Sequence, residues 1–515
     1  MVLPKLYEKY ILTITFYTHE GHGVGRVDGF VVMIPGALRC EVCEVEITCL
    51  KKRYALGRLC RVITPSDCRQ KSFCEYYEMC GGCNLQHMKY EETLFFKEEA
   101  VKNVLSRVGK VAQEDLDVFE GIVGMNEPYS YRNVVRYHAD RDGRLGFYEA
   151  GTNQVIDIEH CLLQSDESNE LYAYLREYLK VNDLLYIEDI VIRVAKGALN
   201  EHETGENKKA FADMRLVTML ILVVDEKTFI DGNEKVCTST RDSILTDMKR
   251  LADCIRGRFD SCKSVYLSVK SDRTHPHKAV GDENILMAGD KGLIDWIGDM
   301  AFFISPESFF QVNPVQTKKL YAKVLEYAGL KGNEKVYDLF CGVGSITLFL
   351  ARLAGEVTGI EMVSSAIDDA FANKDLNGLT NVKFVNGDVK EYLRLSTLDE
   401  RAEVIVVDPP RTGCDKELLV GMAQANPDRI VYVSCNPATL ARDIAVLGEE
   451  GFEVMKVCPV DMFPWTEHVE CVVLLSKLVP QSHINVKVEF GEGDGKIPID
   501  QIMRKAKEYE SHMKN

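Results

Sequence analysis

Short apolar runs alternate with amphipathic segments over residues 301–478 of this 515-residue chain. Three of these runs are Val336–Leu339, Val357–Ile360 and Val404–Val407. Each has the length of a buried strand, and strands that alternate with helices are typical of a parallel sheet covered by helices. The sequence therefore predicts an α/β domain in this region.

A glycine-rich turn, Asp338–Ser345, follows the first run. Its Gly342 and Gly344 let the backbone approach a ligand closely where a strand passes into a helix. The next two runs end in Glu361 and Asp388, whose carboxylates suit ribose hydroxyls and an adenine amino group. Together these strand ends predict a crevice for a nucleotide-like ligand, although either acid is also suited to capping a helix.

The turn favours S-adenosylmethionine over a dinucleotide. It lacks the G-x-G-x-x-G spacing that holds pyrophosphate, and an acidic Asp338 would repel a phosphate group. Asp408–Arg411 ends the fourth run, and its two prolines fix an extended loop beside the donor. Arg411 stands where amino-group methyltransferases carry an aromatic residue, so amino methylation is disfavoured.

Cys435 ends another apolar run and precedes Asn436 and Pro437. A cysteine next to a cofactor crevice suggests a transferase that activates its substrate through sulfur. We expect Arg411, or a helix beginning after Pro437, to lower the pKa of this thiol. Three other cysteines lie near the motifs without this context: Cys341, Cys414 and Cys471.

Glu470, in His468–Glu470, is the candidate base that removes a proton from the substrate. The alternative is a surface glutamate at the start of a strand.

A second group of cysteines points to a metal. The chain has 17 cysteines, an odd number that argues for reduced thiols. Cys74, Cys80 and Cys83 follow the spacing C-x5-C-x2-C around two glycines. Cys161 or Cys68 would supply a fourth ligand, and the spacing alone suits zinc or an iron–sulfur cluster equally.

The remaining regions are less specific. At 46% apolar content the chain can bury several cores, and its length favours two to four domains. Residues 1–64 are predicted to form the short strands of a small barrel, and residues 65–300 an irregular middle. A helix is predicted over 90–109, and we expect it to pack on the C-terminal α/β domain. Residues 479–515 form a charged tail, either a peripheral helix or disordered. With no membrane-length apolar stretch and no signal peptide, we expect a cytoplasmic protein without a membrane partner.

Charge is distributed unevenly along the chain. The whole chain carries −17, whereas residues 1–64 hold nine Lys and Arg against six Asp and Glu. A locally positive barrel suits docking to RNA phosphates, and a solvated barrel surface is the alternative.

Two resemblances extend these expectations. The N-terminal region resembles the TRAM domain of RNA-modifying enzymes in Gly21–Arg26, Asp28–Phe30 and Ile34–Ala37. The chain to about residue 478 resembles the RNA 5-methyluridine methyltransferases, specifically their cluster-bearing 23S rRNA branch. Five motifs in the order of the family carry the second resemblance: Ser308–Asn313, Asp338–Gly344, Asp408–Arg411, Ser434–Pro437 and His468–Glu470.

The family resemblance implies a Rossmann-like methyltransferase domain, an OB-like N-terminal barrel and a central α+β iron–sulfur domain. It also implies methylation of uridine C5 in 23S rRNA through a covalent bond between Cys435 and C6, with Glu470 as the base. Phe309 would stack on a flipped base, unless it is a core residue. The implied cofactor contacts are Gln311, Phe340, Glu361, Asp388 and Asp408. The implied [4Fe-4S] ligands are Cys74, Cys80, Cys83 and Cys161, with Cys68 as an extra.

Three alternatives accompany this interpretation. A tRNA uridine methyltransferase would use the same chemistry on another target. A non-catalytic RNA-binding or folding factor would keep the fold, although the presence of both Cys435 and Glu470 speaks against it. Radical methylthiotransferases also carry TRAM domains, but the C-x3-C-x2-C run that they need does not occur here. A monomer is the favoured oligomeric state.

Overall fold

The computed structural model describes residues 3–111, 118–198, 215–229, 241–271, 279–395 and 401–477. Residues up to Lys477 form one compact unit, and the tail predicted over 479–515 lies outside the described residues. Within the described ranges, no helix has both the length and the apolar character that crossing a lipid bilayer requires.

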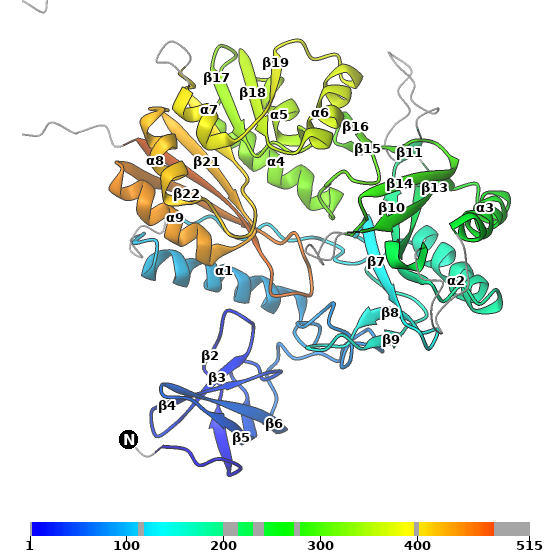
Figure 1. The fold of residues 1–515 in the computed structure, drawn as a ribbon. Helices are drawn as coiled ribbons and strands as arrows, with labels where there is room; N and C mark the ends of the chain where they lie inside the picture. Colours follow the sequence, from blue (N-terminus) through cyan, green and yellow to red (C-terminus); the bar gives the residue numbers. More distant parts are fainter. Residues whose placement is uncertain are drawn as a thin grey trace, which may run out of the picture. The chain divides into compact units, whose positions relative to one another are not determined.

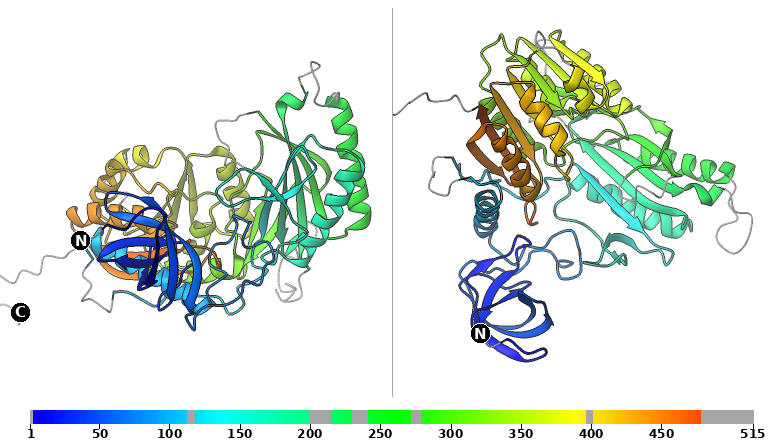
Figure 2. Two further views of the ribbon diagram at one scale, coloured as in Figure 1. Left: turned by 90° about the horizontal axis from the view of Figure 1, so that it is seen from below. Right: turned by 60° about the vertical axis from the view of Figure 1, so that its left-hand side comes forward.

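Six strands near the N-terminus form one curled sheet, drawn in blue in Figures 1 and 2. The strands are β1 (Lys9–Thr13), β2 (Phe16–Tyr17), β3 (Gly23–Val27), β4 (Phe30–Ile34), β5 (Val42–Leu50) and β6 (Tyr54–Thr64), in the sheet order β1-β5-β6-β4-β3-β2. Burial alternates along β4 because successive side chains point to opposite faces, and Val32 and Ile34 are fully buried. The predicted β-module over residues 1–64 is therefore present.

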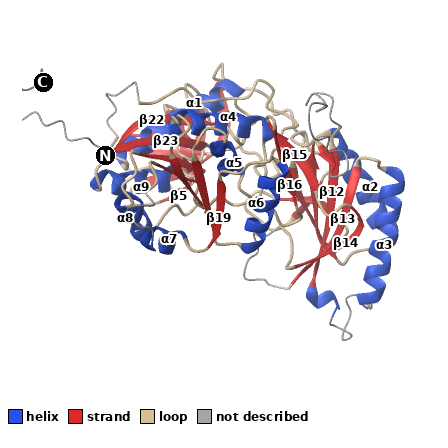
Figure 3. Ribbon diagram, turned by 90° about the horizontal axis from the view of Figure 1, so that it is seen from above, coloured by secondary structure: helices blue, strands red, loops and turns tan. Residues whose placement is uncertain are grey.

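A seven-stranded sheet organises the middle of the chain, in the order β14-β13-β12-β10-β7-β8-β9. Its strands are β7 (Val134–Ala139), β8 (Leu145–Tyr148), β9 (Val155–Asp157), β10 (Ile187–Ala195), β12 (Val217–Asp225), β13 (Cys262–Lys270) and β14 (Glu283–Gly289). Helices α2 (Asp166–Val181) and α3 (Arg241–Arg258) cover one face (Figure 3), where Leu175 and Leu251 share a core with Leu222. β12 is buried along its whole length, as its apolar sequence predicts.

Shorter elements connect this sheet to the C-terminal region. A 3-10 turn, Glu226–Phe229, follows β12, and a three-stranded sheet has the order β11-β15-β16. Its strands are β11 (Gly197–Ala198), β15 (Leu293–Ile297) and β16 (Met300–Ile304), and helix α4 (Pro314–Ala328) comes next.

The C-terminal sheet has the order β19-β18-β17-β20-β21-β23-β22. Its strands are β17 (Lys335–Leu339), β18 (Glu356–Glu361), β19 (Val382–Asn386), β20 (Val404–Val407), β21 (Arg429–Ser434), β22 (Phe452–Val460) and β23 (Glu470–Lys477). The pairs among β17 to β21 are parallel, and β23 is antiparallel to both of its neighbours. The predicted parallel sheet is therefore confirmed, with two antiparallel strands added at one edge.

Helices cover both faces of this sheet. One core includes residues of α4, α5 (Ser345–Ala351) and α6 (Ser364–Leu376). The opposite core includes residues of α7 (Val389–Leu395), α8 (Lys416–Gln424), α9 (Pro437–Glu449) and α1 (Tyr90–Arg107). Val101 and Leu105 of α1 are fully buried there, so a helix from the first quarter of the chain packs on the C-terminal sheet.

Candidate active site

The carboxyl ends of five parallel strands meet at one edge of the C-terminal sheet. Because the strands run in the same direction, residues that follow them are brought to the same side. The predicted site residues at these ends, in chain order, are Phe340, Glu361, Asp388, Asp408 and Cys435.

The glycine turn after β17 contains residues with positive φ angles, which most side chains disfavour. Phe340 has a φ of 64° and Gly344 a φ of 80°, in the left-handed region that favours glycine. A Cβ at Gly344 would lie 2.8 Å from the ring of Phe384, which is closer than packing allows. The Gly342 amide donates to the Glu361 Oε2 at 3.2 Å, so the end of β18 holds the turn in shape.

The two acids after β18 and β19 have different partners. Glu361 accepts hydrogen bonds at Oε1 from the amides of Met362 and Val363, each at 2.8 Å. Asp388 is exposed, and its Oδ1 accepts from the Glu391 amide at 3.0 Å in the first turn of α7. Asp388 therefore caps a helix in this structure, whereas Glu361 bridges the turn and the strand end.

Asp338 is less charged than the sequence suggested. Its carboxyl is buried, accepts a hydrogen bond from Thr347 Oγ1 at 2.5 Å, and has a pKa raised to about 7 by that burial. Repulsion between Asp338 and a phosphate is therefore weaker than expected. The argument against a dinucleotide rests instead on the missing third glycine of the turn.

The loop that carries Gln311 is fixed from two sides. The Asn133 Nδ2 donates to the Gln311 carbonyl at 3.0 Å, and Arg193 Nη2 donates to the Ser308 carbonyl at 2.8 Å. Asn313 caps α4 and donates to the Met462 carbonyl at 3.0 Å. The loop therefore joins the central sheet to the segment that leads into β23.

Phe309 projects from this loop into solvent. Its side chain is 73% exposed, whereas the neighbouring Phe310 is buried against Phe302. The alternative that Phe309 is a core residue is wrong. An aromatic face held in solvent is available for stacking on a base.

Cys435 lies between β21 and α9. Asn436 caps α9, so the helix begins after Cys435 as expected. The Cys435 side chain is partly accessible, whereas the three other cysteines near the motifs are buried: Cys341, Cys414 and Cys471. Among these four thiols, Cys435 is the one that a substrate can reach.

Glu470 is the first residue of β23 and lies beside Cys435. Ser434 of β21 pairs with Cys471 of β23 in antiparallel register, so the residues that adjoin this pair are Cys435 and Glu470. Glu470 is 5% exposed, which rules out a surface glutamate. Burial, reinforced by Asp408 and opposed by Arg411, raises the pKa of Glu470 to about 8.

The pKa of Cys435 moves in the direction opposite to the prediction. Burial first, and then the negative charge of Glu470, raise it to about 11. Arg411 lowers it, as expected, but does not outweigh burial and the carboxyl groups. The sequence predicted the effect of Arg411 on the thiol. It did not predict that the folded chain places the carboxyl groups of Glu470 and Asp408 near the same thiol.

His468 holds the Arg411 side chain, a role that the sequence did not reveal. Arg411 Nη2 lies 3.0 Å from His468 Nδ1. The Arg411 carbonyl accepts from Asn436 Nδ2 at 3.2 Å and from Thr439 Oγ1 at 3.3 Å. The one available signal was the position of His468 two residues before Glu470.

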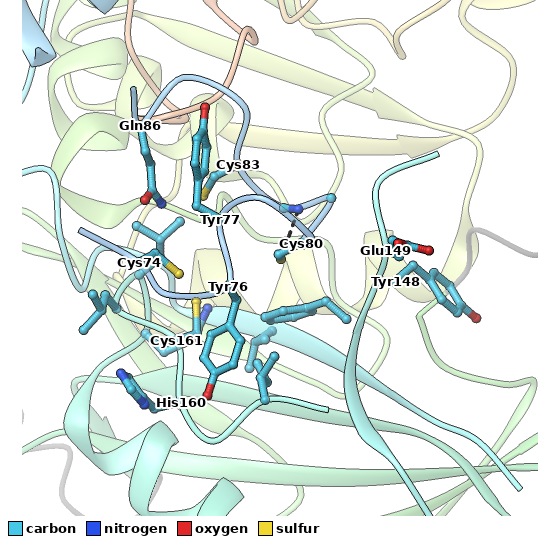
Figure 4. A pocket seen from close by; sticks show the side chains of 18 of the residues that line it. Cys74, Tyr76, Tyr77, Cys80, Cys83, Gln86, Tyr148, Glu149, His160 and Cys161 are labelled. Atoms are coloured by element: carbon cyan, nitrogen blue, oxygen red, sulfur yellow. Dashed lines mark hydrogen bonds between the residues drawn. The ribbon is translucent and has the colours of Figure 1, made fainter. Parts of the chain in front are cut away.

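The second cysteine group surrounds a cavity of about 440 Å³ (Figure 4). The lining includes the four predicted ligands, Cys74, Cys80, Cys83 and Cys161. Cys68 is outside the lining and lies beside Glu92. Within the described residues, no three His, Cys, Asp or Glu side chains converge as ligands of one metal ion. The predicted iron–sulfur domain is therefore not shown, although the four thiols share one cavity.

The cavity wall contains polar groups without partners. Burial raises the pKa of Cys83 to about 12 and that of Cys161 to about 11, and the charge of Arg132 opposes both shifts. Arg132 Nε and Gln164 Oε1 are buried on this wall and have no hydrogen-bond partner. Buried polar atoms normally find partners, so these two point to an occupant.

Comparison with known proteins identifies the family. A family model described as tRNA (Uracil-5-)-methyltransferase matches residues 297–478, and a TRAM domain model matches residues 8–60. An uncharacterised RNA methyltransferase of Caldanaerobacter subterraneus is 38% identical over 478 residues, covering 92% of this chain and 99% of that protein. Another from Halalkalibacterium halodurans is 40% identical over 468 residues, covering 90% of this chain and 96% of that protein. The chain belongs to the RNA (uracil-5-)-methyltransferase family.

Membership of the RNA (uracil-5-)-methyltransferase family confirms the predicted enzyme class and the N-terminal TRAM domain. A solved structure shows the same fold. It is the tRNA (uracil-54, C5)-methyltransferase of Pyrococcus abyssi in complex with S-adenosyl-L-homocysteine, at a TM-score of 0.66 and 24% identity. The match covers 90% of this chain and 100% of that one.

Proposed function

We propose that this protein transfers a methyl group from S-adenosylmethionine to C5 of a uridine in RNA, through a covalent adduct with Cys435. One observation carries the proposal: a partly accessible thiol adjoins a buried carboxyl group whose pKa is about 8. A nucleophile beside a tunable base is the pair that this chemistry requires.

The residues act in sequence on the uracil ring. The Cys435 thiolate forms a bond to C6, and the electrons of the C5–C6 double bond move towards the C4 oxygen, which makes C5 nucleophilic. S-adenosylmethionine supplies the methyl group to C5. Glu470 then takes the C5 proton, the C5–C6 double bond forms again, and the carbon–sulfur bond breaks to release the thiolate.

The charges around the pair match these steps. Arg411 stabilises the anionic form of Cys435, while burial keeps the resting thiol protonated. Glu470 has a pKa of about 8, close to the pH at which a general base is most effective.

The donor would be held by the polar edge of the C-terminal sheet. Glu361 and Asp388 present carboxylate oxygens suited to ribose hydroxyls and an amino group, Phe340 presents a ring, and Asp408 faces Cys435 and Glu470. Gln311 would contact the donor from the loop before α4. The S-adenosyl-L-homocysteine bound to the Pyrococcus abyssi enzyme, which has the same fold, supports this donor.

We also propose that Cys74, Cys80, Cys83 and Cys161 hold a [4Fe-4S] cluster. The donor set fits, because the four thiols line one cavity and cysteine thiols lose their protons when they bind iron. The unpartnered Arg132 Nε suits the anionic character of such a group. A single tetrahedral zinc ion would instead need four sulfurs about 2.3 Å from one point. The cluster would crosslink the chain here and takes no part in the steps above.

The RNA target is proposed to be 23S rRNA, since a TRAM domain and a four-cysteine set occur together. A tRNA target is the second candidate, favoured by the fold shared with a tRNA (uracil-54, C5)-methyltransferase over 90% of this chain.

Two measurements test the function. Mapping of 5-methyluridine in rRNA and tRNA, from cells with and without the gene, should show one or more uridines that lose the methyl group only in rRNA. Loss in tRNA would select the second candidate. If labelled S-adenosylmethionine labels no RNA while RNA binding persists, the protein is an RNA-binding factor and the proposed activity is wrong.

A further inference from the structure

Arg411 is the cation that bears on the reacting thiol. Its charge and a hydrogen bond lower the pKa of Cys435, and the same charge opposes the raised pKa of Glu470. A residue that fixes the Arg411 guanidinium therefore raises the fraction of Cys435 that is ionised.

The backbone and the side chain of Arg411 are held separately. Its carbonyl accepts from Asn436 and Thr439 at the start of α9. Its guanidinium lies against the imidazole of His468, with 3.0 Å between Nη2 and Nδ1. The same Nη2 lies 3.4 Å from Nε2. A guanidinium has only donors, so the ring nitrogen that it contacts must be unprotonated. We assign this acceptor to the nearer Nδ1, and the contact requires a neutral His468.

The imidazole itself is held by its own turn. The His468 amide donates to Thr466 Oγ1 at 3.3 Å, and the ring packs edge-on against Phe463 with 6.1 Å between centroids. The charged groups that face the ring are Arg411, Glu467, Lys97 and Arg132. Burial lowers the pKa of His468 most, and the three cations lower it further. Glu467, whose Oε1 lies 3.8 Å from Nε2, raises this pKa but does not outweigh burial and the cations.

We propose that His468 is a positioning residue for methyl transfer, whose neutral Nδ1 holds the Arg411 guanidinium against the Cys435 thiolate. The inference rests on the proposed function, because it assigns importance to the ionisation of Cys435. Protonation of His468 would remove the acceptor and place a second cation beside Arg411. The step in which Cys435 bonds to the ring should therefore fail at acidic pH, separately from the later step that uses Glu470.

The test measures the reactivity of the Cys435 thiol directly. The full-length protein, without RNA, is treated with iodoacetamide, and alkylation of the Cys435 peptide is followed by mass spectrometry from pH 5 to 9. In His468→Ala the rate at pH 8 should fall about tenfold, the effect of a shift of one pKa unit. In His468→Asn, whose Oδ1 keeps an acceptor, the rate should stay within about threefold of the unaltered protein.

A kinetic measurement complements the labelling. His468→Ala should lower kcat while leaving the KM for S-adenosylmethionine unchanged, and His468→Asn should recover kcat. His19→Ala, at a histidine whose side chain is 87% exposed, is the matched control and should change neither measurement.

The outcomes separate this inference from the proposed function. Equal alkylation rates in His468→Ala and the unaltered protein would overturn the positioning role. So would an Asn variant as slow as the Ala variant. If Cys435→Ala keeps full methyl transfer, the proposed function fails, while the alkylation result still decides whether His468 acts on the thiol.

Discussion

Glu470 adjoins Cys435 across the antiparallel pair of β23 and β21, because Cys471 is the partner of Ser434. Both groups rest in their protonated forms near neutral pH, with pKa values of about 8 and about 11. The thiol must therefore lose its proton before attack, and the carboxyl group must be ionised before the adduct can resolve.

Replacement of Cys435 by alanine should abolish methyl transfer, because no thiol remains to add to C6. The affinity for S-adenosylmethionine should stay nearly unchanged, since the cofactor contacts lie on other strand ends. Labelled methyl incorporation and calorimetric titration with the cofactor measure the two effects. Cys254→Ala, at an exposed cysteine of α3, is the control and should retain full activity.

The Glu470→Gln variant should trap the covalent intermediate. The methylated adduct forms, but no carboxylate is available to take the C5 proton, so a protein–RNA complex that survives denaturation should accumulate. Electrophoresis under denaturing conditions with labelled RNA detects it. Glu467→Gln, on the same turn, should turn over without a trapped species, and absence of the complex in the Glu470 variant would contradict the assignment of the base.

Resolution of the adduct should accelerate as the pH rises. Glu470 works as a base only when ionised. Its pKa of about 8 means that it is half ionised at about pH 8, and the ionised fraction levels off only above about pH 9. Single-turnover measurements between pH 6 and 9.5 would show this increase in the rate of resolution. A rate of resolution that is flat across the range would show that another group removes the proton.

Asp338 should make the fold less stable as the pH rises. Its pKa is about 7 in the folded chain, against 3.8 for an aspartate in an unfolded chain, so the folded state binds more protons between these limits. The free energy of unfolding therefore falls from about pH 4 to about pH 7. Asp338→Asn should flatten this dependence in urea titrations, whereas Asp375→Asn, an exposed aspartate of α6, should leave it unchanged.

Removal of Lys97 should destabilise the fold strongly. Its ammonium group lies 2.5 Å from Asp461 Oδ1 with both side chains fully buried, so Lys97→Met leaves a buried carboxylate unpaired. We expect a loss of about 3–5 kcal/mol in the free energy of unfolding. Lys102→Met breaks a partly exposed pair with Glu98 on the same helix and should cost less than about 0.5 kcal/mol. Partial recovery in Lys97→Met/Asp461→Asn would identify the unpaired charge as the cause.

Local sequence patterns predicted much of the fold and the placement of the site. Apolar runs that alternate with amphipathic segments predicted the parallel sheet. The glycines at 342 and 344 predicted a tight turn, and Gly344 has the positive φ that such a turn needs. The apolar run before Cys435 correctly predicted a strand followed by α9. Phe309 remained ambiguous, because a single aromatic residue in a loop has no periodicity that indicates core or surface.

The sequence by itself determined the strands, the glycine turn and the residue types at the strand ends, because these depend on side-chain periodicity and local backbone freedom. Only the tertiary structure decided that Glu470 adjoins Cys435 and that His468 holds Arg411. It also reversed the expected pKa of Cys435. Desolvation and charge interactions depend on distance in space, and the groups concerned come from segments far apart in the chain.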